Sequence, residues 1–420
     1  MSSPALEYAR QNQPRFLAEL KDLLRIPSVS TLPQHKSDIE RAADFLAAQM
    51  RSIGLEHVEV IKTAGHPLVY ADWLHATGKP TALCYGHYDV QPPDPLNEWT
   101  TPPFEPTERN QNLYARGAVD DKGQMFMHLK ALESLMKSGA GKLPINVRLL
   151  LEGEEEVGGE AIAKYIQENP QKLKADFALV SDTEMYAPNL PTLCVGLRGL
   201  VYTEVEARGA KVDLHSGMYG GAAPNPFVAL AQIVAKLKDE NGRIFVPGFY
   251  DRYSVAERTW ARPTLDVHGM PGGFIGAGAK TVIPAKASAK ISMRLVPNQN
   301  PDEIFKRFSN YVKSITPRGI QINIRQISGA DPMLIRTDNH YVQAAKDAMK
   351  EVFGKDTVFI RSGGSIPVVA DFEKHLGIPS VMMGFGLPDD NLHAPNEKFH
   401  IPNFYRGIES IIRFFQLLSS

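Results

Sequence analysis

Short apolar runs that alternate with helical stretches constrain the fold of this 420-residue chain more than any other feature. Helical spacing of apolar residues separates some of these runs, notably at 124–137 and 161–167. Runs that are apolar on both faces are typical of strands in a sheet buried under helices, with most strands parallel. The pattern therefore predicts an α/β fold with a helix-covered, largely parallel sheet. The runs in question are 68–73, 82–85, 147–151 and 177–180.

The pattern changes near Gly196. Residues 201–207 and 285–295 alternate apolar with polar side chains, as half-buried antiparallel strands do. The α/β pattern returns from about Ala330. We therefore expect one α/β domain, formed by residues 1–197 and 330–420, that is interrupted by an inserted α+β domain of residues 198–329.

Composition excludes several classes of protein. Apolar residues make up 43% of the chain and the formal net charge is −1, so no overall cationic field favours nucleic acid. No stretch approaches the roughly 18 apolar residues of a membrane span, and the N-terminus lacks the apolar region of a secretory signal. The chain has two cysteines, Cys84 and Cys194, a number that suits a reducing compartment. We expect a cytoplasmic protein with neither a nucleic-acid nor a membrane partner.

Acids and imidazoles stand where the predicted strands end. His87 and Asp89 follow the run 82–85, the triplet Glu154-Glu155-Glu156 follows the run 147–151, and Asp182 follows the run 177–180. In open α/β sheets, ligands bind beyond the carboxyl ends of the strands. These side chains are therefore candidate metal ligands.

Two further acids and a second histidine extend this set. Asp120 and Asp121 stand at a predicted helix start between two glycines, and His393 lies in a proline-rich loop. Each residue alone has an ordinary explanation, such as a solvated histidine or an acid that complements a helix dipole. Together, mostly carboxylates with two histidines form the ligand set of a hydrolase with paired divalent metals.

Five segments carry these residues in order: Gly86-His87-Tyr88-Asp89-Val90, GAVDDKG at 117–123, Glu155-Glu156-Val157-Gly158, Ser181-Asp182 and HAPNE at 393–397. They resemble the metal motifs of the carnosinase and cytosolic nonspecific dipeptidase family of binuclear zinc metallopeptidases. Segments 213–217, 281–284, 294–297 and 363–367 also resemble family signatures. The resemblance spans nearly the whole chain. It implies a metal-binding catalytic domain and an inserted lid and dimerisation domain.

The resemblance also implies a cofactor and its ligands. We expect two divalent ions per chain, with zinc as the default and manganese or cobalt as alternatives. A zinc-bound water is acidic near pH 7, so hydroxide is available at neutral pH. The implied ligands are His87 and Asp182 for one ion, Glu156 and His393 for the other, and Asp120 as the bridge between them.

The same resemblance implies catalytic roles for two acids, each of which stands within two residues of a candidate ligand in the sequence. Asp89 would hydrogen-bond His87 and fix its tautomer, and Glu155 would be the general base that takes a proton from a metal-bridging water. The glutamate triplet leaves an alternative register, in which Glu154 is the base and Glu155 the ligand. We prefer Glu155 and Glu156, because the family's acidic pair is followed by one residue and then glycine.

The resemblance implies substrate-binding roles for the remaining candidates. His215 resembles the histidine that reaches a neighbouring subunit's site and stabilises an oxyanion, which implies a homodimer; the alternative is an ordinary surface histidine. Arg294 resembles the arginine that binds the substrate's free carboxylate, for which its planar fork is well suited. Gly364 and Ser365 would line the same end of the pocket.

The resemblance implies hydrolysis of the amide bond in dipeptides or short peptides with a free C-terminal carboxylate. The same residues could serve an N-acyl-amino-acid deacylase or a carboxypeptidase. An alternative from another class is a noncatalytic ligand-binding protein on this fold. One departure from the family is a shorter segment between Tyr250 and Trp260, in the inserted domain.

Overall fold

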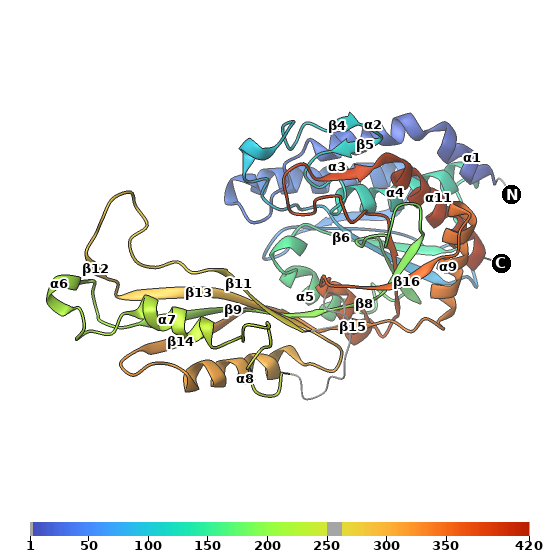
Figure 1. Cartoon of the computed structure of the whole chain (residues 1–420). Coiled ribbons are helices and arrows are strands. Elements are labelled where there is room, and N and C mark those ends of the chain that lie inside the picture. Colours follow the sequence, from blue (N-terminus) through green and yellow to red (C-terminus); the bar gives the residue numbers. More distant parts are fainter. Residues whose placement is uncertain (1–2, 250–262, 420) are drawn as a thin grey trace. The chain divides into compact units, whose positions relative to one another are not determined.

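The computed structural model describes residues 3–249 and 263–419, which form two compact units (Figure 1). The first unit contains the chain up to Val195, then Ile335–Ile360, and then Val368 onward. The second unit contains Gly196–Leu334 together with Arg361–Pro367. The shortened segment after Tyr250 falls on residues 250–262, outside the described part of the chain.

The main sheet confirms the predicted α/β class. Its strand order is β1-β2-β6-β3-β7-β17-β8-β15, and β16 pairs with β8. Strands β6, β3, β7 and β17 run parallel to one another, whereas the outer pairs are antiparallel. The strands are β1 (Glu56–Ile61), β2 (Leu68–Trp73), β3 (Thr81–His87), β6 (Asn146–Glu152), β7 (Phe177–Val180), β8 (Thr192–Leu197), β15 (Met333–Leu334), β16 (Val358–Ser362) and β17 (Ser380–Gly384).

Helices of the first unit cover this sheet (Figure 1). The central helix is α4 (Lys122–Ser138), which is buried along nearly its whole length and packs on β3. Four helices pack around α4: α1 (Pro4–Gln11), α2 (Gln13–Leu24), α3 (Lys36–Ile53) and α11 (Ile401–Leu418). The remaining helices are α5 (Glu160–Glu168), α9 (His340–Phe353) and α10 (Pro367–Asp371). A small sheet pairs β4 (Thr107–Arg109), β5 (Asn112–Tyr114) and β18 (Lys398–His400).

Local sequence explains where some helices begin and end. Ser3 accepts a hydrogen bond from the Leu6 amide at 3.4 Å, and Pro4 occupies the first helical position of α1. Helix α3 ends at Gly54, whose φ of 101° lies in the left-handed region that glycine adopts without steric cost.

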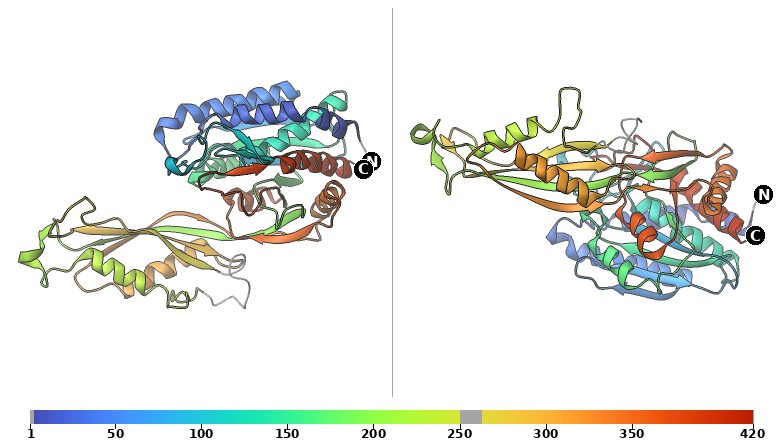
Figure 2. Two further views of the ribbon diagram at one scale, coloured as in Figure 1. Left: turned by 45° about the horizontal axis from the view of Figure 1, so that its top comes forward. Right: turned by 90° about the horizontal axis from the view of Figure 1, so that it is seen from below.

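The second unit is built on an antiparallel sheet in the order β11-β13-β9-β14. The strands are β9 (Gly199–Arg208), β11 (Thr264–Gly269), β13 (Lys286–Leu295) and β14 (Gln321–Ala330), and a short pair adds β10 (Leu214–His215) and β12 (Val282–Ile283). Helices α7 (Pro226–Ala235) and α8 (Pro301–Ser314) pack against this sheet, and α6 (Ser216–Tyr219) follows β10 (Figure 2).

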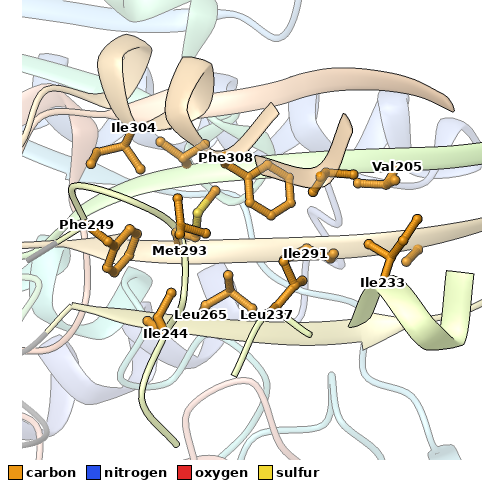
Figure 3. Close-up of a cluster of buried hydrophobic side chains, with 14 of the residues drawn as sticks. Val205, Ile233, Leu237, Ile244, Phe249, Leu265, Ile291, Met293, Ile304 and Phe308 are labelled. Carbon is orange, nitrogen blue, oxygen red and sulfur yellow. The ribbon is translucent and has the colours of Figure 1, made fainter. Parts of the chain in front are cut away.

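One face of this sheet carries the core of the second unit. Buried and partly buried residues alternate along β9, so every second side chain faces the helices. Figure 3 shows Ile233 of α7 and Phe308 of α8 among the strand residues Val205 and Ile291, and all four are fully buried or nearly so. The second unit therefore has a hydrophobic core of its own.

No helix in residues 3–249 or 263–419 combines the length and the apolar character that a membrane span requires.

Candidate metal centre

Three adjacent parallel strands bring candidate ligands to one edge of the main sheet. His87 is the last residue of β3, Glu156 lies in the 3₁₀ turn η3 (Glu155–Val157) after β6, and Asp182 follows β7 by two residues. Because β6, β3 and β7 are parallel neighbours, their carboxyl ends meet at the same edge.

Two loops complete the set. Asp120 and Asp121 directly precede α4 and are joined by a cis peptide bond. His393 lies in the loop after β17, where its φ of 59° is in the left-handed region. Both loops carry their side chains to the edge where the three strands end.

Asp120 joins two groups of ligand atoms. Its Oδ1 lies 3.1 Å from His87 Nε2, which is in turn 3.9 Å from Asp182 Oδ2. Its Oδ2 lies 2.9 Å from His393 Nε2, which is 3.4 Å from Glu156 Oε2. Within each group, one ligand atom per residue lies within 4.8 Å of the others. The structure therefore brings all five candidate ligands together, with one carboxylate shared.

Asp89 links the ends of β3 and β6. Its side chain is fully buried, and its Oδ1 lies 3.4 Å from His87 Nδ1, whose nearest partner is the Asp89 carbonyl at 3.1 Å. The same carboxylate accepts hydrogen bonds from the backbone amides of Glu155 at 3.2 Å and Glu156 at 3.1 Å. Asp89 therefore holds both the imidazole and the turn that carries the two glutamates.

The first and the last of the three consecutive glutamates have different surroundings. Glu154 is buried and accepts hydrogen bonds from the backbone amides of His66 at 2.7 Å and Ala161 at 2.8 Å. Glu156 instead accepts one from Gln91 Nε2 at 2.7 Å and faces His393. Of the two glutamates that the sequence left as candidate ligands beside Asp120 and His393, only Glu156 belongs to their group.

Glu397 is a buried residue to which the sequence assigned no role. Its carboxylate accepts hydrogen bonds from Arg116 Nη1 at 2.6 Å and from the backbone amides of Gly117, Val119 and Asp120 at 3.0 to 3.2 Å. Glu397 thereby ties the loop of Asp120 to the loop of His393, from which it is four residues away. Its position in the HAPNE motif was visible in the sequence, but its partners depend on tertiary structure.

The candidate metal centre contains an excess of acidic side chains, and this excess changes their pKa values. Burial raises the pKa of Glu155 and of Asp182 well above the usual range, and repulsion from nearby carboxylates adds to the effect. Hydrogen bonds to Asp120 and Glu156 raise the pKa of His393 to about 11. Although burial alone would raise the pKa of Asp120, its hydrogen bonds to the two histidines lower it. Carboxylates outnumber imidazoles here, so a bound cation would relieve their repulsion.

The donor set fits a divalent transition metal. Imidazole nitrogens and carboxylate oxygens are the ligands of zinc in hydrolases and are also compatible with manganese or cobalt. Each of the two groups offers one imidazole and two carboxylates, counting Asp120 in both. Calcium and magnesium fit less well, because both prefer oxygen ligands.

The second unit brings two predicted substrate-binding residues together. Arg294, near the end of β13, donates a hydrogen bond from Nη1 to Ser365 Oγ at 2.8 Å. Arg198, which the sequence did not single out, donates from its backbone amide to the Gly364 carbonyl at 3.1 Å and from Nε to the Gly363 carbonyl at 2.8 Å. Burial and the nearby charge of Arg294 lower the pKa of Arg198. This cluster therefore concentrates positive charge.

His215 lies on β10 of the second unit. Its side chain is exposed, and its Nδ1 accepts a hydrogen bond from the Gly217 amide at 3.0 Å. The five candidate ligands, in contrast, all belong to the first unit.

Comparison with known proteins places these features in a family. The model of "Peptidase family M20/M25/M40" matches residues 83–417. The chain is 30% identical to the Cys-Gly metallodipeptidase dug1 of Schizosaccharomyces pombe, and the alignment covers 99% of this chain and 98% of that protein.

Solved structures agree with this match. Human carnosine dipeptidase 1 superposes with a TM-score of 0.88 at 27% identity, covering 99% of this chain and 98% of that one. The M20 metallo-carboxypeptidase Sso-CP2 from Sulfolobus solfataricus has a TM-score of 0.85 at 32% identity, covering 96% of this chain and 99% of that one.

Proposed function

Because the chain belongs to peptidase family M20/M25/M40, we propose that it is a metal-dependent dipeptidase. The observation that carries this proposal is the pair of ligand groups that share Asp120. The relatives named as a metallodipeptidase and a dipeptidase, which align over nearly their whole length, support the same substrate class.

In this proposal the centre holds two divalent ions, zinc by default and manganese or cobalt otherwise. Bound ions of this kind polarise a scissile carbonyl and lower the pKa of water. The contacts of Asp120 with both histidines support its role as the bridge. The proposed ligands are His87 and Asp182 on one side, Glu156 and His393 on the other, and Asp120 between them.

Glu155 is the proposed general base. It lies next to the ligand Glu156, and its backbone amide is held by Asp89. A carboxylate in this position can take a proton from water and pass it to the leaving amine. Asp89 has a positioning role, since it holds the imidazole of His87 and the turn of Glu155 together.

The substrate's free carboxylate is proposed to bind at Arg294, with Gly364 and Ser365 beside it. The hydrogen bond between Arg294 and Ser365 supports this grouping. His215 is proposed to act on the partner subunit's reaction as an oxyanion donor, which requires a homodimer. We also propose a cytoplasmic location, which suits a chain with only two cysteines, both buried.

A carboxypeptidase is the second candidate function. The similarity to Sso-CP2 at 32% identity favours it, and the arginine cluster suits any substrate with a free C-terminal carboxylate. An N-acyl-amino-acid deacylase would use the same groups.

A substrate panel tests the proposal and separates the candidates. The zinc-loaded protein should be assayed with unblocked dipeptides, N-blocked dipeptides, longer peptides and N-acetyl amino acids. A dipeptidase cleaves unblocked dipeptides with the highest kcat/KM, whereas a carboxypeptidase prefers the N-blocked or longer peptides. Binding of these compounds without any hydrolysis would favour the noncatalytic alternative.

A further inference from the structure

A second cluster of imidazoles and carboxylates lies at the outer edge of the main sheet. Strand β1 is the edge strand, and Glu56 at its start stands opposite Asp72 of β2. The pairing is irregular between Glu56 and Glu59, and His57 in this bulge has a φ of 49°. The irregularity turns His57 toward β2, where its Nδ1 lies 2.7 Å from Asp72 Oδ1.

Each member of this cluster is held in place by a neighbour. The Tyr70 hydroxyl donates a hydrogen bond to Asp72 Oδ2 at 2.8 Å, and Arg148 lies 3.8 Å from the same oxygen, so that Oδ1 faces His57. His75 Nε2 lies 2.9 Å from Glu56 Oε2, and its ring packs edge-on against Trp73. Asp72 is thus a buried anchor, whereas the side chains of His57 and His75 are 69% and 60% exposed.

We propose that Glu56, His57 and Asp72 form a further binding site for a zinc-like divalent ion, with His75 beside Glu56 as an additional donor. One ligand atom from each of the three residues lies within 4.8 Å of the others, as in the two groups of the metal centre. A donor set of imidazole and carboxylate favours zinc over calcium or magnesium.

The topology separates this outer site from the metal centre. Asp72 pairs with Arg148 near the start of β6, whereas Glu155 and Glu156 follow the end of that strand at Glu152. The four residue-to-residue steps from Arg148 to Glu152 alone span about 13 Å at roughly 3.3 Å per step. The outer site lies toward the opposite end of the sheet, and its ion does not take part in the reaction.

A bound ion at this position would join the edge strand β1 to β2. Ion pairs between exposed side chains contribute little by themselves, whereas an ion that binds only the folded state stabilises it by an amount that grows with the logarithm of the ion concentration above Kd. The site would therefore make the stability of the sheet edge depend on zinc. This inference does not depend on the proposed dipeptidase activity.

The test compares zinc uptake by wild type and two variants of the full-length protein. His57→Asn removes one ligand but keeps a residue that tolerates the left-handed backbone. His35→Asn is the matched control, because His35 Nδ1 lies 2.8 Å from Asp38 Oδ2 but no three-residue ligand group of the described residues includes it. Protein should be dialysed against buffered free Zn²⁺, followed by metal analysis, a thermal-unfolding scan and an activity assay.

Wild type and His35→Asn should both bind about one ion per chain more than His57→Asn at intermediate zinc concentrations. Loss of a direct ligand should weaken the outer site by at least the ~10- to 100-fold that the loss of a supporting contact costs. Zinc should also raise Tm less in His57→Asn, while activity stays at the wild-type value in both variants. Equal zinc uptake by wild type and His57→Asn would overturn the proposal, and so would equal losses in both variants.

Discussion

The metal centre of the first unit and the arginine cluster of the second unit hold their functional groups in different ways. Three candidate ligands of the centre lie at or just beyond the ends of adjacent parallel strands, so the sheet register fixes their positions. The arginine cluster instead joins Arg294 on β13 to Ser365, in a segment that returns to the second unit from far along the chain. The first arrangement suits chemistry that needs fixed geometry, and the second suits recognition of a carboxylate.

Glu155→Gln should have the largest effect, because it keeps the shape of the side chain but removes the proposed base. We expect kcat to fall by at least ~10²-fold, with the metal content nearly unchanged. Steady-state kinetics and metal analysis of the same preparation measure both quantities.

Glu154→Gln is the matched control for this substitution, since Glu154 hydrogen-bonds two backbone amides and does not belong to either ligand group. It should keep most of the activity. If Glu154→Gln loses kcat while Glu155→Gln loses a metal ion, the alternative register of the triplet is correct.

His215→Ala should have the next largest effect. The loss of one oxyanion donor lowers kcat by roughly 10²–10³-fold, and the metal content should not change. Mixing His215→Ala with Glu155→Gln subunits tests whether the histidine acts across a dimer. A heterodimer would contain one site with an intact Glu155 and a borrowed His215, so part of the activity should return. If subunits exchange and no activity returns, His215 is not shared between chains.

Glu397→Gln tests how the loops of the centre are held. The amide side chain removes the charge that Arg116 and three backbone amides contact, so the loops of Asp120 and His393 lose a common anchor. We expect metal affinity to fall by ~10- to 100-fold and kcat at saturating zinc to be largely restored. Cobalt-substituted protein should show a changed visible absorption spectrum.

Asp390→Asn is the control that shows whether neutralising any buried carboxylate of this loop lowers metal affinity. Asp390 is a fully buried carboxylate of the same loop and pairs with Lys398 at 2.6 Å rather than with the Asp120 loop. Equal losses of metal affinity in both variants would argue that Glu397 has only a general structural role.

Arg294→Lys should have the smallest effect of the series. Lysine keeps the charge but loses the planar fork, and one lost charge-assisted hydrogen bond costs about tenfold in kcat/KM. Most of this change should appear in KM. Arg325→Lys is the control, because Arg325 lies in the same unit and pairs with Glu204 at 2.8 Å. Unchanged KM for dipeptides in Arg294→Lys would remove Arg294 from the substrate site.

A contrast between buried and exposed strands of the main sheet explains which parts of the fold the sequence could predict. The largely buried strands β2, β3 and β7 stand out as apolar runs, and the acids that follow β3 and β7 are located by the positions of these strands. The edge strand β1 escaped prediction because its exposed side chains include Glu56 and Glu59 and form no apolar run. Catalytic roles remain predictions, although the structure brings the five candidate ligands together.

The sequence pattern could not predict contacts that depend on tertiary structure. The four donors to Glu397 and the contacts of Arg198 with Gly363 and Gly364 join segments far apart along the chain. The outer cluster requires the bulge at His57, which depends on how β1 pairs with β2. No local periodicity encodes these long-range contacts.

Zinc titration of metal-stripped protein tests the central claim most directly. Dipeptide hydrolysis should be absent from the stripped protein and should return as the two groups that share Asp120 are filled, at about two ions per chain. His393→Ala should bind less zinc and recover little activity in the same titration. Full dipeptidase activity in protein shown by metal analysis to be free of divalent ions would contradict the account.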